Sequence, residues 1–197
     1  VTATLNRPDQ RNAISELSHS EEIQDFCADV TRDTTIRAVI LTGAGKVFSA
    51  GADLAEAKAG LATAPEWERL SSRIAAMPGL TIAALNGTLA GGAFGMALAC
   101  DLRLSVAEAK FFYPVMKLGF LPQPSDPPRL VRLVGPARAK MILMAGQKIA
   151  AAEALDWGLI DRIVAPEALL DSAAQLATDC LAASPAHVAA IKAMCQP

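Results

Sequence analysis

The chain has 197 residues, of which 52% are hydrophobic and 19% are charged, and its formal net charge is −2. This length and composition predict one globular domain over residues 1–197 that buries roughly 70% of its unfolded surface. The small net charge excludes a general basic field for nucleic acid. No apolar run reaches the ~20 residues that a membrane-spanning helix needs, and no signal peptide is visible. We therefore expect a cytoplasmic protein without a membrane partner.

The first predicted helix lies near residue 20. The segment Ser18–Glu21 has the pattern of a capping box, in which the Ser and Glu side chains bind free N–H groups at a helix start. Apolar residues then recur at helical spacing and predict the buried face of this helix: Ile23, Phe26, Cys27 and Val30.

Two later apolar runs, Arg37–Gly43 and Leu80–Gly87, are short and end in glycine. Such runs are typical of buried parallel strands. A glycine-bearing segment accompanies each of them, Ser49–Asp53 after the first and Asn86–Ala93 at the end of the second. The order of strand and glycine turn therefore occurs twice, which indicates a diverged supersecondary repeat.

Each glycine segment opens a predicted helix, over Ala52–Lys58 and Gly91–Cys100. The N–H groups at a helix start lack intrahelical partners and lie at the positive end of the helix dipole. If the two segments converge, their N–H groups form an oxyanion hole for a carbonyl oxygen that gains negative charge. The alternative is structural, since Gly91, Gly92 and Gly95 also permit a helix to pack closely on a sheet.

Between these segments, four residues at helical spacing favour core packing over a cofactor site: Trp67, Leu70, Ile74 and Met77. A proline-rich turn follows at Gly119–Pro128. Further helices are predicted over 137–145 and 166–181, and from Pro185 onward.

Basic, cysteine and histidine residues indicate no further site. One basic cluster is interpreted as a solvated helix face: Arg129, Arg132, Arg138 and Lys140. The cysteines lie in helix-like apolar stretches without a C-x-x-C pair, so we expect reduced core residues: Cys27, Cys100, Cys180 and Cys195. His19 and His187 are expected at surface or cap positions, and no metal site can be assembled.

Four ordered blocks resemble the enoyl-CoA hydratase/isomerase (crotonase) superfamily: Leu5–Ile14, Ala38–Leu54, Leu85–Phe111 and Ala154–Val164. The resemblance implies an α/β fold, a crotonase-like spiral of repeated β-β-α units. It also implies an acyl-CoA thioester as substrate, with coenzyme A as part of that substrate and no permanently bound cofactor. The two peptide N–H donors of its oxyanion hole correspond to Ala52 and Gly92. A homotrimer or dimer of trimers is expected, as is an incomplete first strand and C-terminal helical region in this chain.

The resemblance also carries substrate contacts over to this sequence. Ligand-contacting residues are implied at the following positions: Ala50, Ala52, Asp53, Leu54, Ala55 and Gly92. Arg11 lies where a basic residue often meets the CoA phosphates, although a solvated loop arginine is the alternative interpretation. Asp53 alternatively caps the helix that follows it.

The sequence departs from the hydratase pattern at two positions. Hydratases of this superfamily carry glutamates where this chain has Gly95 and Val115, and neither residue can transfer a proton. General acid–base catalysis contributes ~10²–10⁴-fold, so a mechanism that adds water with two carboxylates is hard to support. Isomerase-like or other enolate chemistry is favoured.

The turn at Gly119–Pro128 supplies the remaining acid/base candidates. Gln123 stands where isomerases, decarboxylases and dehalogenases of the superfamily place a polar residue, but it cannot titrate. Asp126 acts as a base only if the turn folds inward, and its apolar surroundings would then raise its pKa. Tyr113 is the other candidate. The alternatives are a solvated turn aspartate and a partly buried tyrosine.

Two segments resemble motifs of other functions, but neither motif is complete. A P-loop at Thr42–Lys46 fails because Val47 replaces the Ser or Thr that binds magnesium. A serine hydrolase at Ser49 fails because Val47 also replaces the first glycine of G-x-S-x-G. A non-catalytic acyl-CoA binder, or an enzyme with lapsed activity, remains the alternative, since both glutamates are absent while the glycine segments persist. The sequence does not identify the acyl group.

Overall fold

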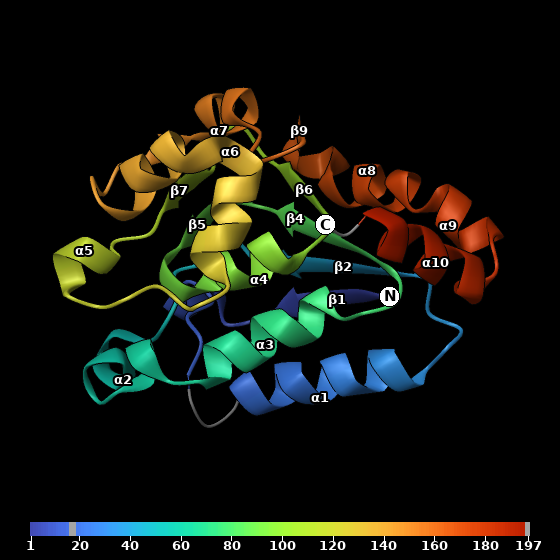
Figure 1. Cartoon of the computed structure of the whole chain (residues 1–197), viewed down its shortest axis with the longest axis horizontal. Helices are drawn as coiled ribbons and strands as arrows, with labels where there is room; N and C mark the ends of the chain where they lie inside the picture. Colours follow the sequence, from blue (N-terminus) through green and yellow to red (C-terminus); the bar gives the residue numbers. More distant parts are fainter. Residues whose placement is uncertain (16–18, 196–197) are drawn as a thin grey trace.

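The computed structural model describes residues 1–15 and 19–195. Its centre is a sheet of parallel strands in the order β1-β2-β4-β6-β9 (Figure 1). These strands are β1 (Thr2–Leu5), β2 (Ala38–Gly43), β4 (Leu80–Leu85), β6 (Leu102–Ser105) and β9 (Arg162–Ile163). All of β2 is buried, and so is β4 after Leu80, because parallel strands are covered on both faces.

A second, smaller sheet has the strand order β3-β5-β7-β8, and only the pair β7–β8 is antiparallel. Its strands are β3 (Val47–Ser49), β5 (Thr88–Ala90), β7 (Lys110–Phe112) and β8 (Ile149–Ala150). Each of β3, β5 and β7 directly follows a strand of the first sheet, and a helix comes next. This arrangement confirms the predicted α/β fold of repeated β-β-α units.

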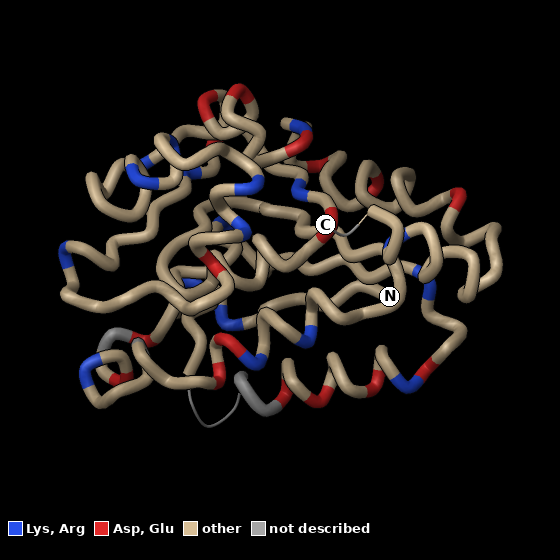
Figure 2. Tube along the Cα trace, in the orientation of Figure 1, with Lys and Arg blue, Asp and Glu red and all other residues tan. Residues whose placement is uncertain are grey.

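Helices surround the two sheets. Their bounds are α1 (His19–Arg32), α2 (Leu54–Lys58), α3 (Glu66–Ala75), α4 (Phe94–Ala99), α5 (Val115–Leu118), α6 (Asp126–Leu143), α7 (Ala151–Trp157), α8 (Leu169–Leu176), α9 (Thr178–Ala182) and α10 (Pro185–Cys195). Helix α3 contacts both α1 and α4, and α4 also contacts α6 (Figure 1). Acidic and basic residues are interspersed along the trace (Figure 2). Among the described residues, no helix is both long and apolar enough to cross a bilayer.

The apolar faces predicted for the first two long helices are confirmed. On α1, Cys27 and Val30 are buried, and Ile23 and Phe26 pack against the core. The four residues predicted for the next helical face are all buried: Trp67, Leu70, Ile74 and Met77. The capping box predicted over 18–21 includes residues outside the described part of the chain, and it stays a prediction.

The helix predicted over 137–145 begins eleven residues earlier than expected, at Asp126 in α6. Pro127 and Pro128 are compatible with a helix start, because the N–H groups that they lack have no intrahelical partner there. The expected boundary is only a kink at Gly135, whose φ is 79°.

Two other expectations were wrong. The helix predicted over 166–181 is divided into a 3-10 turn, α8 and α9, because Ala177 lies between the two α-helices with φ −88° and ψ −6°. Cys180 is only partly buried and Cys195 is exposed, whereas Cys27 and Cys100 are buried.

Helix α10 has an apolar composition but buries only Val188 among its described residues, so composition did not reveal which face contacts the core.

Candidate active site

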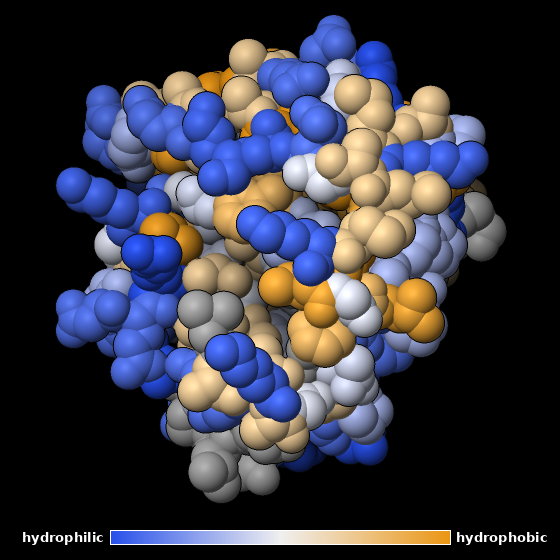
Figure 3. Space-filling model, turned by 90° about the vertical axis from the view of Figure 1, so that its left-hand side faces the viewer, coloured by the Kyte–Doolittle hydropathy of each residue, from blue (hydrophilic) through white to orange (hydrophobic). Residues whose placement is uncertain are grey.

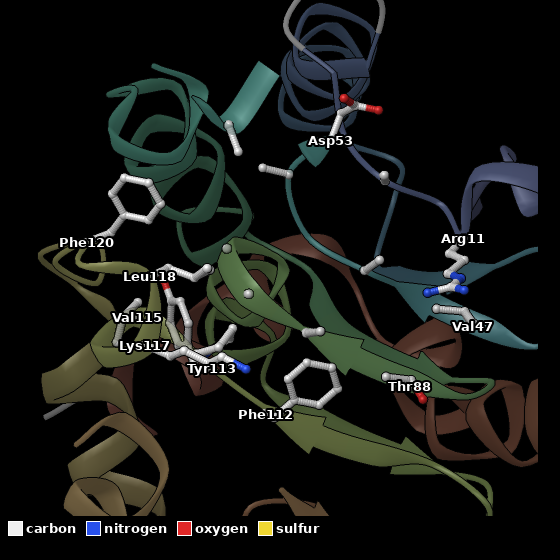
Figure 4. Close-up of a pocket in the computed structure, with 18 of the residues that line it drawn as sticks. Arg11, Val47, Asp53, Thr88, Phe112, Tyr113, Val115, Lys117, Leu118 and Phe120 are labelled. Carbon is white, nitrogen blue, oxygen red and sulfur yellow. The ribbon is translucent and has the colours of Figure 1, made fainter. Parts of the chain in front are cut away.

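A cavity of about 1130 Å³ lies where the glycine segments meet the β7–α5 connection. Its lining comes from residues 9–13, 47–57, 88–92 and 110–121, together with Trp67 and Lys148. The face that carries α2 and α5 is hollowed, and apolar residues gather beside the hollow (Figure 3). Arg11 lies at one end of the cavity, and Tyr113, Leu118 and Phe120 lie at the other (Figure 4). One end of the cavity therefore carries Arg11, and the other is mainly apolar and aromatic, with Lys117 beside these side chains.

The two glycine segments are in direct contact within this cavity. Gly51 has a φ of 88°, and a Cβ atom at this position would lie 2.8 Å from the Ala90 carbonyl oxygen and 3.2 Å from the Gly92 nitrogen. Such an approach and such a φ require glycine. The strand–turn–helix pattern predicted this convergence, although not its distance.

The N–H groups of Ala52 and Gly92 are both left out of the local backbone pairing. A bridge holds the first segment, in which the Ile14 N–H donates to Gly51 and the Asp53 N–H donates to Ile14, at 2.8 and 3.0 Å. Ala52 therefore contributes no N–H to that bridge. Gly92 is the second residue of the 3-10 turn η3 (Gly91–Ala93), where N–H groups have no intrahelical partner. Both residues line the cavity.

Trp67 covers Gly92 from α3. A Cβ atom on Gly92 would lie 3.1 Å from the Trp67 ring, and the ring N–H donates to the Leu61 carbonyl at 2.8 Å. The sequence predicted Trp67 as a core residue, and it is buried, but it also lines the cavity. Helical spacing alone gave no signal for this second role.

Basic side chains surround part of the cavity. Arg11 is exposed and lines it, as do Lys110, Lys117 and Lys148. The Lys148 ammonium lies 4.6 Å from the centroid of the Phe112 ring, a cation–π contact. Sequence reasoning identified only Arg11, because the three lysines come from segments whose proximity depends on the fold.

The predicted substrate contacts are mostly brought together. Ala50, Ala52, Asp53 and Ala55 line the cavity. The Asp53 side chain also accepts the Ala55 N–H at 2.9 Å and so caps α2, which confirms the alternative interpretation of this residue. The side chain of Leu54 lies outside the described part of the structure.

Tyr113 and Asp126 form a buried pair. The Tyr113 hydroxyl donates to Asp126 Oδ2 at 2.9 Å, and the Asp126 side chain is 1% exposed, so the predicted turn does fold inward. Burial raises the pKa of Asp126 to about 6, although the Tyr113 hydrogen bond and the charge of Arg129 act in the opposite direction. Burial above all, and then the charge of Asp126, raises the pKa of Tyr113. Asp126 can therefore gain or lose a proton near neutral pH, whereas Tyr113 keeps its proton.

Gly95 makes room for the Asp126 carboxylate. A Cβ atom on Gly95 would lie 2.9 Å from Asp126 Oδ1, and this oxygen is buried without a hydrogen-bond partner among the described residues. Tyr113 lines the cavity, whereas Asp126 lies behind it. Val115 also lines the cavity and gives it an apolar wall.

The structure changes the interpretation of two residues near this pair. Gln123 is buried, and its carbonyl accepts the Asp126 N–H at 3.0 Å, so its backbone shapes the turn. Arg129, predicted on a solvated face, is partly buried, and its charge affects the pKa of both Asp126 and Glu68. Glu68 was not identified from the sequence, because it lies on α3, far from the turn along the chain.

Residues 1–196 match the family model described as enoyl-CoA hydratase/isomerase. The chain is 35% identical over 186 residues to the 1,2-epoxyphenylacetyl-CoA isomerase of Escherichia coli strain K12, a match that covers 90% of this chain and 71% of that protein. It is 34% identical over 194 residues to a short-chain-enoyl-CoA hydratase of Clostridium acetobutylicum, covering 95% of this chain and 74% of that protein.

A solved structure gives the same result at the level of the fold. The 1.8 Å crystal structure of an enoyl-CoA hydratase from Bacillus anthracis aligns with a TM-score of 0.89 at 32% identity. The alignment covers 97% of this chain and 76% of that chain. The names of these relatives include both an isomerase and hydratases, so similarity alone does not select one reaction.

Proposed function

Because the chain belongs to the enoyl-CoA hydratase/isomerase (crotonase) family, we propose that it forms the enolate of an acyl-CoA thioester in a backbone oxyanion hole. The thioester carbonyl oxygen accepts hydrogen bonds from the N–H groups of Ala52 and Gly92. The observation that carries the proposal is the close approach of the two glycine segments. A Cβ atom added to Gly51 would lie only 3.2 Å from the Gly92 nitrogen.

The two donors act on charge that develops during the reaction. When the bond between a proton and the α-carbon breaks, its electron pair moves toward the thioester carbonyl, and the oxygen becomes negative. N–H groups fixed before the reaction stabilise this oxygen, and removing one such donor typically costs about 3 kcal/mol. The positive end of the helix that starts at Phe94 adds to the effect.

Asp126 is the proposed proton acceptor. Its unpartnered Oδ1 lies against Gly95, one helical turn after the donor Gly92. The ionised carboxylate takes the α-proton of a β,γ-unsaturated thioester, and the electron pair of the broken C–H bond forms a dienolate. Asp126 then returns the proton to the γ-carbon, which moves the double bond to the α,β position without consuming water. This step requires the carboxylate to reach the cavity past Tyr113, and it favours isomerase-like chemistry over hydration.

The cavity also supports a proposal for how the thioester lies. Its mainly apolar end, with Leu118 and Phe120, suits the acyl group, and the end that carries Arg11 suits the phosphates of coenzyme A (Figure 4). Arg11 and Lys148 are the proposed phosphate contacts. The structural observation is that both residues are exposed and line the cavity.

A second candidate is a non-catalytic acyl-CoA binder. The observation that favours it is the position of Asp126, which lies behind Tyr113 rather than among the residues that line the cavity. In this case the oxyanion donors and the basic residues bind the thioester, and no proton moves.

Exchange of α-protons in D₂O separates the two candidates. Saturated and unsaturated acyl-CoA thioesters of different chain length are incubated with the protein, and deuterium uptake is followed by NMR. Exchange in at least one thioester is expected, because exchange reports the enolate whatever the later step. Tight binding by calorimetry without exchange in any thioester would leave the binder and reject the enzyme.

A further inference from the structure

Two carboxylates, rather than one, lie at the start of α6. Asp126 is the first residue of this helix, and Glu68 reaches it from α3. The Glu68 carboxylate accepts the backbone N–H of Ser125 at 3.1 Å and also accepts the Ser125 hydroxyl. On its own helix it accepts the Ser72 hydroxyl at 3.2 Å. Glu68 therefore joins α3 to the residue just before Asp126.

The start of α6 has few other ways to fix its geometry. Ser125 occupies the N-cap position, but its side chain makes no capping hydrogen bond to its own helix. Pro127 and Pro128 have no N–H group to offer. The carboxylate of Glu68 instead holds the N-cap residue Ser125 from outside the helix, at a helix end where a negative charge is favourable.

The pKa values of the two acids are shifted in opposite directions. Burial alone would raise the pKa of Glu68, but hydrogen bonds from Ser125 and Ser72 and the charge of Arg129 hold that pKa below its usual value. The negative charge of Glu68 in turn contributes to the raised pKa of Asp126. The charged and titratable groups that face Asp126 are Glu68 from α3, Tyr113 from the β7–α5 connection and Arg129 from α6 itself. A pair of acids separated in this way is the usual arrangement for proton transfer.

We propose that Glu68 is a positioning residue for Asp126: it anchors Ser125 and so keeps the Asp126 carboxylate in the space beside Gly95. Glu68 does not line the cavity, so it acts only through Asp126. The inference rests on the proposed function only for the catalytic use of Asp126, because the placement and protonation of that residue can be measured without turnover.

The first test measures the pKa of Asp126 directly, by ¹³C NMR of its side-chain carboxyl in the full chain. Glu68→Gln keeps an acceptor oxygen for Ser125 but removes the charge, so the pKa of Asp126 should fall by about half a pH unit or more. The matched control is Glu66→Gln on the same helix, where Glu66 pairs with the exposed Arg69 at 3.2 Å and lies two residues away, on a different face. The control should leave the pKa of Asp126 unchanged.

Ser125→Ala is the second variant, and it decides the question if Glu68→Gln does not fold. It keeps the charge of Glu68 but removes the hydroxyl contact, so the turn loosens, Asp126 regains water and its pKa falls toward the ordinary value of 3.8. An unchanged pKa of Asp126 in the variants that fold would overturn the role of Glu68.

Kinetics then separate this inference from the proposed function. In Glu68→Gln, the acid limb of the pH profile for α-proton exchange should move to lower pH by the same amount as the pKa of Asp126, with KM little changed. If the wild-type protein exchanges no α-protons, the proposed function fails while the NMR measurement still tests Glu68. If exchange occurs and neither the pKa nor the acid limb moves, only the role of Glu68 fails.

Discussion

The cavity and the buried cluster behind it are built in different ways. Around Gly51 and Gly92 the chemistry belongs to the backbone, and each contributing segment is a short continuous stretch that glycine allows to approach the other. At the start of α6 the chemistry belongs to the side chains of Glu68, Tyr113 and Asp126, which come from three separate elements.

The two regions tolerate substitution differently: the backbone donors depend little on residue type, whereas the proton acceptor depends on it strongly. A backbone donor is kept by any residue that fits the local conformation, whereas a proton acceptor depends on one side-chain type at one position. In this chain the Asp126 carboxylate of α6 lies beside Gly95 of α4. Under the proposed function, the proton acceptor therefore comes from α6 while the two backbone donors stay in the glycine segments.

The largest expected effect concerns hydration of crotonyl-CoA by the wild-type protein. Gly95 and Val115 supply neither a base for water nor an acid for the α-carbon, and each missing proton transfer lowers a rate by ~10²–10⁴-fold. We expect kcat/KM far below the ~10⁶ M⁻¹s⁻¹ of an efficient enzyme, measured as loss of the enoyl absorbance. A value at or above that level would show that the acid/base region is misassigned.

Gly95→Glu would not simply restore a hydratase. A Cβ atom at this position lies 2.9 Å from Asp126 Oδ1, so the new side chain must displace the Asp126 carboxylate. The variant is expected to lose α-proton exchange without gaining efficient hydration. Gain of hydration with exchange retained would mean that the two acids occupy separate spaces.

The next effect tests the side-chain region directly. Asp126→Asn keeps the shape of the residue and an acceptor for Tyr113 but cannot take a proton, so α-proton exchange should fall by ~10²–10⁴-fold. Asp29→Asn is the matched control, because Asp29 is an exposed aspartate of α1 that pairs with Arg32 and is not part of the cavity lining. The control should stay within a few-fold of wild type, and equal losses in both variants would remove Asp126 from the mechanism.

The backbone region is tested by two substitutions at Gly92. Gly92→Pro removes the N–H donor, and exchange should fall by ~10²–10³-fold with a smaller loss of affinity for CoA. Gly92→Ala keeps the donor but adds a Cβ atom 3.1 Å from the Trp67 ring, so it measures the effect of crowding alone. Equal exchange rates in the two variants would show that the Gly92 N–H does not bind the thioester oxygen.

The same contrast explains how much of the molecule was predictable. Strands β2 and β4, the glycine segments and the buried face of α3 carry local signals, and these were predicted from the sequence. The missed strands have only two to four residues each, which is too few to show a period: β3, β5, β6, β7, β8 and β9. The start of α6 was missed because Pro127 and Pro128 were interpreted as a turn, although proline is also common at a helix start.

The acid/base region lay largely beyond sequence reasoning for a physical reason. Tyr113 and Asp126 were candidates by residue type, but whether they meet depends on the fold of the turn between them. Glu68 carried no signal, because a glutamate on the polar side of an amphipathic helix is ordinary until another segment binds it. Long-range hydrogen bonds between side chains leave no periodic trace in one sequence.

The smallest expected effect is thermodynamic and concerns the pH dependence of folding. The pKa of Asp126 is raised from 3.8 to about 6 in the folded chain, chiefly by burial. The native state therefore holds this proton more tightly than the unfolded chain, and stability falls as the pH rises from about 4 through about 6, by an amount on the order of 2–3 kcal/mol.

In Asp126→Asn this contribution disappears, so the difference in unfolding free energy between pH 4 and pH 7, measured in urea, should shift in favour of pH 7 relative to wild type. Comparing each protein with itself at two pH values cancels the fixed effect of a buried amide. An unchanged pH dependence would mean that the pKa of Asp126 is not raised in the folded chain.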